Sequence, residues 1–168
     1  MVMTSFSGGI QMISQAEANR LIGMEKKLKI ESGIILPPPG KIINIEAASL
    51  DDREEFIFSV QRGRIRLEKY SQQERYAEVV PLVRLCVDYK PHTNPPRFFP
   101  FDPSFAQYAE KDMGSTHLHL YLEEINDKFA IPVPNLEFHS LSNISITTLD
   151  FLKYCHVINA GSVQSGLI

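Results

Sequence analysis

Two short stretches of the chain carry the side chains best suited to chemistry. Residues 91–95 read Pro-His-Thr-Asn-Pro, and residues 117–121 read His-Leu-His-Leu-Tyr. Histidine titrates near neutral pH and is the commonest metal ligand among side chains. Because residues two apart in a strand share one face, His117 and His119 are expected on the same side, about 7 Å apart. The proline-flanked turn would aim His92 from the end of a strand, so these residues together define the candidate site.

Metal-independent acid/base chemistry on a ribose phosphate is the first function that these residue types predict. One histidine would withdraw the 2′-hydroxyl proton while another protonates the leaving oxygen, and arginines would stabilise the phosphate charge. The catalytic candidates are His117, His119, His92 and Tyr121. The candidates for binding the substrate are Arg64, Arg66, Arg84 and Asn94. This hypothesis needs no cofactor and expects RNA as the partner.

A divalent transition metal is the cofactor of a further hypothesis, which ranks third. Imidazole nitrogens suit such metals, and three protein ligands leave an open position for water. Residues 114–123 have the spacing Gly-x-x-His-x-His-x-x-x-Glu, which looks like part of the first cupin motif, although no second cupin motif follows. The metal ligands would be His117, His119, His92 and Glu123.

The runner-up to the ribonuclease hypothesis, ranked ahead of the metal site, is a non-catalytic interaction protein, in which the strand histidines are ordinary residues of a solvated sheet face. The loop after the proline turn bears on this choice, because its aromatic side chains would stack bases in the RNA hypothesis. Otherwise they would form a small satellite core beneath a long connection. These aromatic residues are Phe98, Phe99, Phe101, Phe105 and Tyr108.

The elements expected to position these residues form an α+β fold. Ser14-Gln-Ala-Glu has capping-box spacing and precedes apolar residues at helical spacing, so we predict a helix over 14–29. A second helix is predicted over 146–157, capped by Thr147 or Thr148. Alternating or short apolar runs predict strands over residues 41–49, 55–62, 64–72, 79–89, 116–123 and 128–133. Their order favours a mainly antiparallel five- to six-stranded sheet with both helices packed on one face.

Alternation along the strands sorts their side chains into two faces. The apolar face, expected under the helices, consists of Ile65, Leu67, Val83, Leu85, Val87, Leu118, Leu120 and Leu122. The opposite face would be cationic and histidine-bearing, with Arg62, Arg64, Arg66, Arg84, His117, His119 and Tyr121. We expect the candidate site on this second face.

Length and composition indicate one domain in a reducing compartment. With 168 residues and 43% apolar content, the chain can build a core without disulfides or a structural metal. Cys86 and Cys155 lack CxxC spacing and read as buried thiols of a cytoplasmic protein. We expect a flexible lead over 1–11, one domain over 12–158 and a flexible tail over 159–168, with no membrane segment. The net charge of −3 neither favours nor excludes a nucleic-acid partner.

Residues 79–134 resemble an uncharacterised family of small bacterial and prophage proteins. The likeness is carried by the Pro-His-x-Asn-Pro turn, by Gly-x-x-His-Leu-His-x-Tyr over 114–121 and by Ala-x-Pro over 130–132. The size and the helix-then-sheet order also look like the small ribonuclease toxins of toxin–antitoxin modules. That likeness implies an RNA-directed activity and a cognate protein partner such as an antitoxin.

Overall fold

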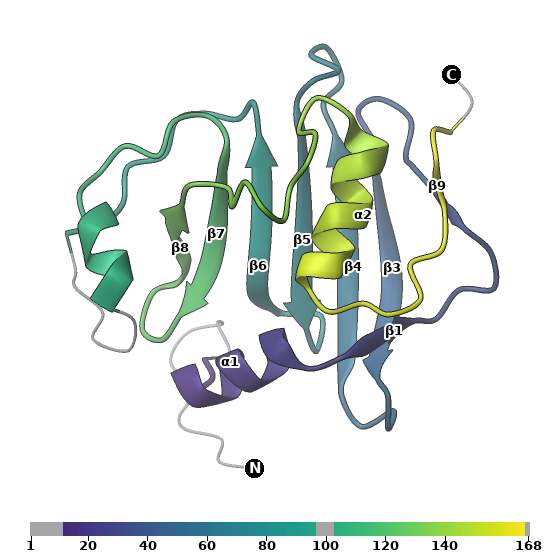
Figure 1. Ribbon diagram of the computed structural model, residues 1–168, viewed down its shortest axis with the longest axis horizontal. Helices are drawn as coiled ribbons and strands as arrows, with labels where there is room; N and C mark the ends of the chain where they lie inside the picture. The colour runs from purple at the N-terminus through teal and green to yellow at the C-terminus, as the bar shows by residue number, and fades with distance from the viewer. Residues whose placement is uncertain (1–11, 97–102, 167–168) are drawn as a thin grey trace.

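A seven-stranded antiparallel sheet is the central element of the fold (Figure 1). The structure is a computed structural model that describes residues 12–96 and 103–166. The sheet has the order β1-β3-β4-β5-β6-β7-β8. Within this sheet, each strand therefore pairs with the strand that follows it in the chain. Its strands are β1 (Lys26–Leu28), β3 (Ile42–Ser49), β4 (Glu55–Arg62), β5 (Tyr70–Tyr76), β6 (Val80–Val87), β7 (His117–Leu122) and β8 (Asn126–Ile131). A separate parallel pair consists of β2 (Ile34–Ile35) and β9 (Val163–Gln164).

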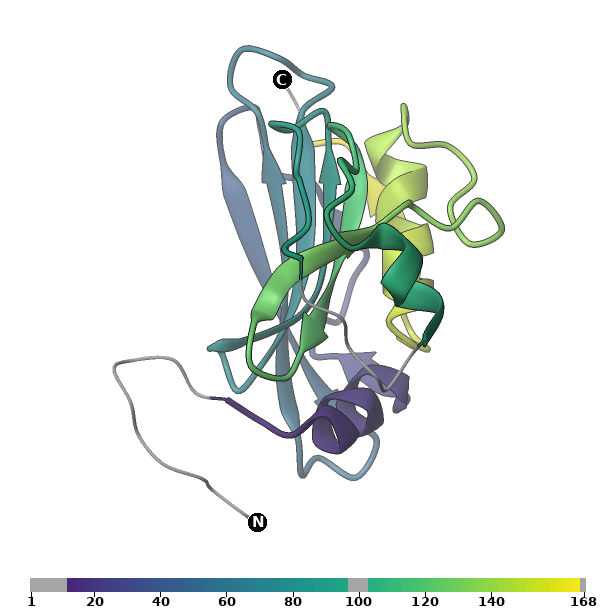
Figure 2. The same cartoon turned by 90° about the vertical axis from the view of Figure 1, so that its left-hand side faces the viewer.

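The helices of the described chain are α1 (Gln15–Gly23), η1 (Pro103–Tyr108, a 3-10 helix) and α2 (Ile144–Tyr154). Figure 2 shows α1 and α2 on the same side of the sheet. In Figure 1, α2 runs along the strands over β4 and β5, whereas α1 lies across the lower ends of the strands. The predicted α+β class with a large antiparallel sheet is therefore confirmed, but the two helices pack in different ways.

The second helix is held to the sheet by buried polar bonds as well as by apolar packing. Tyr70 of β5 donates its hydroxyl proton to the Leu141 carbonyl at 2.6 Å. Gln72, on the same strand, donates to the hydroxyl of Thr148 at 2.9 Å. The helix begins after Asn143, whose side chain accepts two backbone N–H groups of the first turn. The predicted cap at Thr147 or Thr148 is therefore wrong, because both threonines are buried within the helix.

β1 replaces the second half of the first predicted helix, and it raises the strand count to seven. The helix ends at Gly23, and Lys26 and Leu28 then point into the protein with 0% and 3% of their surface exposed. The ammonium of Lys26 lies 3.0 Å from the carboxylate of Glu74. It also donates to three carbonyls at the ends of the two helices, those of Ile22, Met24 and Cys155. This buried lysine joins α1, α2 and β5 at one point.

The segment between β4 and β5 is a turn rather than the start of a strand. The predicted strand over 64–72 begins only at Tyr70, because the Gly63 N–H donates to the Lys69 carbonyl at 2.7 Å and closes a turn over the residues between them. Ile65 and Leu67 are consequently 91% and 54% exposed, so their predicted place on the apolar face is wrong. The other apolar positions predicted on β6 and at Leu118 are buried.

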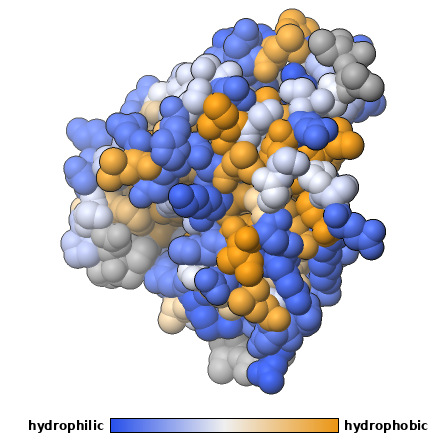
Figure 3. Space-filling model, turned by 45° about the vertical axis from the view of Figure 1, so that its right-hand side comes forward, coloured by the Kyte–Doolittle hydropathy of each residue, from blue (hydrophilic) through white to orange (hydrophobic). Residues whose placement is uncertain are grey.

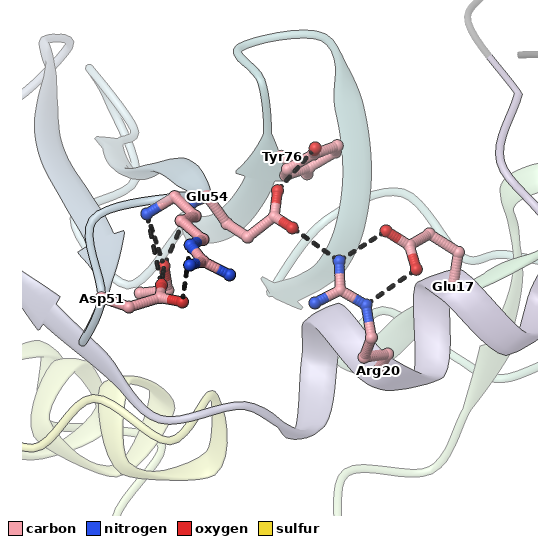
Figure 4. A network of polar contacts seen from close by, with 7 residues as sticks. Glu17, Arg20, Asp51, Glu54 and Tyr76 are labelled. Atoms are coloured by element: carbon pink, nitrogen blue, oxygen red, sulfur yellow. Dashed lines mark hydrogen bonds and ion pairs between the residues drawn. The ribbon is translucent and has the colours of Figure 1, made fainter. Parts of the chain in front are cut away.

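A surface network fastens α1 to the strands that it crosses (Figure 4). The guanidinium of Arg20 donates to both carboxylate oxygens of Glu17, at 2.8 and 2.6 Å, and to Glu54 at 2.6 Å. Glu54 in turn accepts the hydroxyl proton of Tyr76 at 2.7 Å. Because these side chains are partly exposed, the network fixes the angle of the helix more than it adds stability.

Asparagine side chains cover both edges of the sheet. At the β1 edge, Asn159 accepts the N–H of Leu28 at 2.7 Å and donates to its carbonyl at 3.0 Å. At the β8 edge, Asn94 bonds to both backbone groups of Ala130 in the same way. A side-chain amide presents the same donor and acceptor as a peptide unit, so each one substitutes for a neighbouring strand.

β9 lies within the segment predicted as a flexible tail, where it pairs with β2. On this side of the molecule Figure 3 shows apolar groups interspersed with hydrophilic ones, and Ile35 of β2 is 63% exposed. Among the helices of the described residues, none combines the length and apolar character that crossing a membrane requires.

Candidate functional site

β6 and β7 bring a cysteine and two histidines to one face of the sheet. In their antiparallel register Cys86 lies opposite His117, and Arg84 lies opposite His119. Side chains paired in this way are in contact range. These side chains are buried, because the exposed fraction is 2% for Cys86, 2% for His117 and 3% for His119. The helices α1 and α2 lie against the other face, where Leu85 and Leu118 belong to the main core (Figure 2).

The segment after β6 folds back and places a third histidine beside these two. Residues 89–94 form backbone hydrogen bonds with residues 111–115, which precede β7. The ring centroid of His92 consequently lies 4.7 Å from that of His119 and 5.4 Å from that of His117. The centroids of His117 and His119 are 4.7 Å apart. The structure therefore brings the three predicted histidines together.

Asn94 fixes the orientation of His92. The side-chain nitrogen of Asn94 donates to the Ala130 carbonyl, and the side-chain oxygen of Asn94 accepts the Ala130 N–H, so the two ends of the amide are identified. The Nε2 of His92 lies 3.1 Å from that amide oxygen and 3.0 Å from the Lys128 carbonyl. Because both neighbours are acceptors, Nε2 carries the proton, and Nδ1 of the neutral ring has a free lone pair. Asn94, predicted to bind substrate or to orient His92, is placed to do the second.

The two strand histidines also expose lone pairs to the space between them. The Nδ1 of His117 donates to the Gly114 carbonyl at 2.9 Å, which leaves the lone pair on Nε2. The buried Nδ1 of His119 has no hydrogen-bond partner among the described residues. The Sγ of Cys86 and one nitrogen of each of these two rings lie within 4.8 Å of one another. The three ligand atoms therefore lie close enough together to share one bound ion.

Burial controls the protonation of this cluster. It lowers the pKa of His119 to about 3, and the positive charge of Arg84 acts in the same direction. Burial lowers the pKa of His117 as well, and it raises the pKa of the Cys86 thiol. Both strand histidines are therefore neutral at neutral pH, which is the form that binds metal ions. A neutral imidazole with so low a pKa is a poor general acid at that pH.

A pocket of about 290 Å³ opens beside the cluster, and we call it the histidine pocket. It is lined by Cys86, by the three histidines and by the charged side chains Arg84, Lys90, Asp127 and Lys128. Arg84 is paired with Asp127 at 3.1 Å, and its side chain is 34% exposed. The rim therefore carries more positive than negative charge, on a chain whose net charge is −3.

Two predicted site residues lie elsewhere because β7 is irregular. The register between β7 and β8 shifts between Leu120 and Leu122, which indicates a β-bulge. Beyond the bulge, Tyr121 turns into the main core, and its hydroxyl donates to the Ile13 carbonyl at 2.8 Å. Glu123 accepts the backbone N–H of Gln15 at 2.8 Å. The placement of Tyr121 on the histidine face is corrected, and Glu123 lies at the start of α1 rather than with the histidines.

Among the predicted phosphate-binding arginines, only Arg84 lines the histidine pocket. Arg64 and Arg66 lie in the exposed turn between β4 and β5, and Arg66 pairs there with Asp88. Arg62, predicted on the same face, donates to the Pro37 carbonyl at 3.1 Å. The cationic face is therefore much smaller than the alternation predicted.

The aromatic loop is only partly described. Phe98, Phe99 and Phe101 lie outside the described residues. Phe105 and Tyr108, in η1, pack against Phe129 and Leu122 as a second apolar cluster at the edge of the sheet. For these two residues the satellite-core alternative describes their position.

Cys86 is the site residue that sequence reasoning missed. Its thiol was interpreted as inert core, because no nucleophile or metal-binding spacing surrounds it in the chain. The signal that could have found it is the pairing of β6 with β7. An antiparallel register that places Arg84 opposite His119 also places Cys86 opposite His117.

Fold and site together define a class of protein. It is an α+β protein in which three imidazoles and a thiol lie together at one face of the sheet. The chain belongs to a family of unknown function, DUF6978, whose model matches residues 13–157. The predicted membership of an uncharacterised family is thereby confirmed, and the likeness to ribonuclease toxins stays a prediction. Comparison with curated proteins and with solved structures found no match.

Proposed function

We propose that the protein binds a divalent transition metal ion through Cys86, His117 and His119, and that the ion serves a hydrolytic reaction. The observation that carries this proposal is the convergence of three buried ligand atoms within 4.8 Å of one another beside a pocket. Burying polar atoms without partners is costly, and the unpaired Nδ1 of His119 is such an atom. A metal ion would give it a partner.

The ligand types favour zinc among such ions. Thiolate and imidazole both suit zinc, and bond lengths of about 2.0–2.3 Å place the ligands of a tetrahedral site roughly 3.4–3.6 Å apart. The ligand atoms of Cys86, His117 and His119 are close enough to reach that spacing with small side-chain rotations. Structural zinc sites use four protein ligands, whereas catalytic ones use three and keep one position for water. Three ligands beside an open pocket therefore fit the catalytic type.

His92 is the residue placed to move a proton at such a centre. Its ring contacts that of His119, and its Nε2–H is held by Asn94 and Lys128. The Nδ1 lone pair can accept a proton from a metal-bound water, whose acidity the metal increases. The resulting hydroxide would attack the substrate, and His92 would return the proton to the leaving group.

A metal-independent ribonuclease is the second candidate function. It is favoured by one specific observation, the position of Arg84 opposite His119 in the same pocket as His92. Cleavage of RNA that survives a chelator and disappears in His92→Ala would support this candidate over the metal centre.

Metal content tests the leading proposal. Wild-type protein that has been stripped with a chelator, loaded with zinc and desalted is expected to retain about one zinc per chain by elemental analysis. Cys86→Ser is expected to retain much less than one, because the ion loses its thiolate and one of three ligands. His156→Asn is the matched control, since His156 is exposed and adopts a positive φ of 61° that asparagine tolerates. Full zinc retention by Cys86→Ser would contradict the proposal.

A further inference from the structure

The sheet face that carries the histidines is polar well beyond them. One row across the sheet consists of Ser59, Gln73, Arg84 and His119, and the next consists of Gln61, Ser71, Cys86 and His117. No helix among the described residues covers this face (Figure 2). Neither row is explained by the metal centre, which uses only the last residues of each.

A second pocket, the amide pocket, continues the first one along these rows. It has a volume of about 170 Å³ and is lined by Ser59, Gln61, Ser71 and Gln73 together with Arg84 and Tyr89. Arg84 and Tyr89 also line the histidine pocket, so the two pockets meet at these side chains. The two adjoining pockets, taken together as one recess, fall at the lower end of the size range for small-molecule sites.

The two pockets differ in charge. Arg84, Lys90 and Lys128 line the histidine pocket, where the single carboxylate of Asp127 is engaged by Arg84. In the amide pocket the side chains of Gln61 and Gln73 form no hydrogen bond to other described residues. Each free amide offers two donors and an acceptor. The recess therefore suits a ligand with an anionic end and a neutral end rich in hydrogen-bonding groups.

We infer that the substrate is a phosphate monoester of a small polar compound, of the ribonucleotide class. The phosphate would lie in the histidine pocket between Arg84 and the two lysines, where arginine and lysine are the usual partners of phosphate. The sugar and base would lie in the amide pocket against Gln73 and Gln61. Tyr89 lines both pockets. Its hydroxyl donates to the Ser71 hydroxyl at 3.1 Å, and the ammonium of Lys69 lies 4.5 Å from the centre of its ring.

The reaction that follows rests on the proposed metal centre. The oxygen of the metal-bound water would form a bond to phosphorus after its proton passes to His92, and the bond from phosphorus to the ester oxygen would break. The alcohol would leave with the proton from His92, so the products are a nucleoside and inorganic phosphate. Ligand binding itself needs only the two pockets, which allows it to be tested without metal.

Titration of the chelator-treated chain with adenosine 5′-monophosphate, adenosine and inorganic phosphate tests the inference. Binding is followed by backbone amide NMR shifts. The monophosphate is expected to bind at least about tenfold more tightly than either fragment, because it alone fills both pockets. Shifts are expected in β5 and β6 and at Lys128. Gln73→Leu is expected to lower the affinity for the monophosphate by about tenfold and to leave the affinity for inorganic phosphate unchanged. Gln164→Leu, on the distant β9, is the matched control and is expected to change neither of these two affinities.

Two results would overturn the inference. The first is a monophosphate affinity no higher than that of inorganic phosphate, which would mean an anion site only. The second is an unchanged monophosphate affinity in Gln73→Leu. Zinc retention is measured on separate, zinc-loaded samples of the same variants, so the two proposals fail separately. Loss of nucleotide binding with normal zinc content counts against the substrate class, and normal nucleotide binding without zinc counts against the metal centre.

Discussion

Replacing Lys26 with methionine is expected to lower the free energy of unfolding by about 3–5 kcal/mol at pH 8, because it leaves a buried carboxylate without its cation. Lys26 and Glu74 both have 0% of their side-chain surface exposed, and their charged groups are 3.0 Å apart. Burial raises the pKa of Glu74 to about 7, and the ammonium of Lys26 is the largest influence that opposes this rise. In the variant the pKa of Glu74 is therefore expected to rise further.

The effect of this replacement should depend on pH in a definite direction. The pKa of this carboxyl is higher in the folded than in the unfolded chain. At a pH where it is protonated in both states, it does not lower the free energy of unfolding. The cost appears as the pH rises above the ordinary glutamate value of 4.5. At pH 5 we therefore expect a smaller loss, about 1–3 kcal/mol, from the three carbonyls that lose the Lys26 ammonium.

Urea unfolding of wild type and Lys26→Met at both pH values measures this difference. Lys27→Met is the control, since Lys27 pairs with Asp52 at the surface and should change stability by less than about 1 kcal/mol. If Lys26→Met does not fold at pH 8, the double variant Lys26→Met/Glu74→Met should recover much of the loss, because it removes the unpaired charge as well. A single variant as stable as wild type at pH 8 would show that the pair does not join the helices to β5.

Zinc is expected to stabilise the wild-type chain by about 4 kcal/mol at a free concentration a thousandfold above its dissociation constant. For a chain of this size that corresponds to an increase of roughly 8–16 °C in Tm. In His119→Ala the increase should disappear, because the ion loses the ligand whose Nδ1 is buried and unpaired in the described structure. Removal of this buried ring also lowers the starting stability, so the comparison is between the zinc-induced shifts and not between the Tm values.

The control for this experiment is again His156→Asn, which should show the full zinc-induced shift. Calorimetry or thermal melts with and without zinc provide the measurement. An equal shift in wild type and His119→Ala would place the zinc elsewhere on the chain.

Local patterns predicted the framework of the fold and the pair of strand histidines. Period-two alternation is a property of the backbone, so it found β3, β4, β6 and β7 and placed His117 and His119 on one face. It failed where a single residue interrupts the ladder. Because of the bulge after Leu120, Tyr121 points to the opposite face from the one predicted, and no residue type in this stretch predicts the bulge.

The remaining differences come from contacts between distant parts of the chain. Lys26 reads as the polar face of a helix, and only its partners on β5 and α2 make a buried strand position favourable. Cys86 reads as an ordinary core residue until its strand is paired with β7. His92 reaches the cluster because Asn94 bonds to the β8 edge. Register and edge contacts of this kind are set by tertiary packing, which a single sequence does not display.

The visible absorption spectrum of the cobalt-loaded protein tests most directly whether Cys86 and the strand histidines bind a metal ion. With cobalt in place of zinc, wild-type protein is expected to show the intense d–d bands of a four-coordinate ion and a charge-transfer band from the thiolate. Cys86→Ser should lose the charge-transfer band, and His156→Asn should keep the whole spectrum. A wild-type spectrum with the weak bands of a six-coordinate ion and no thiolate charge transfer would contradict the metal centre.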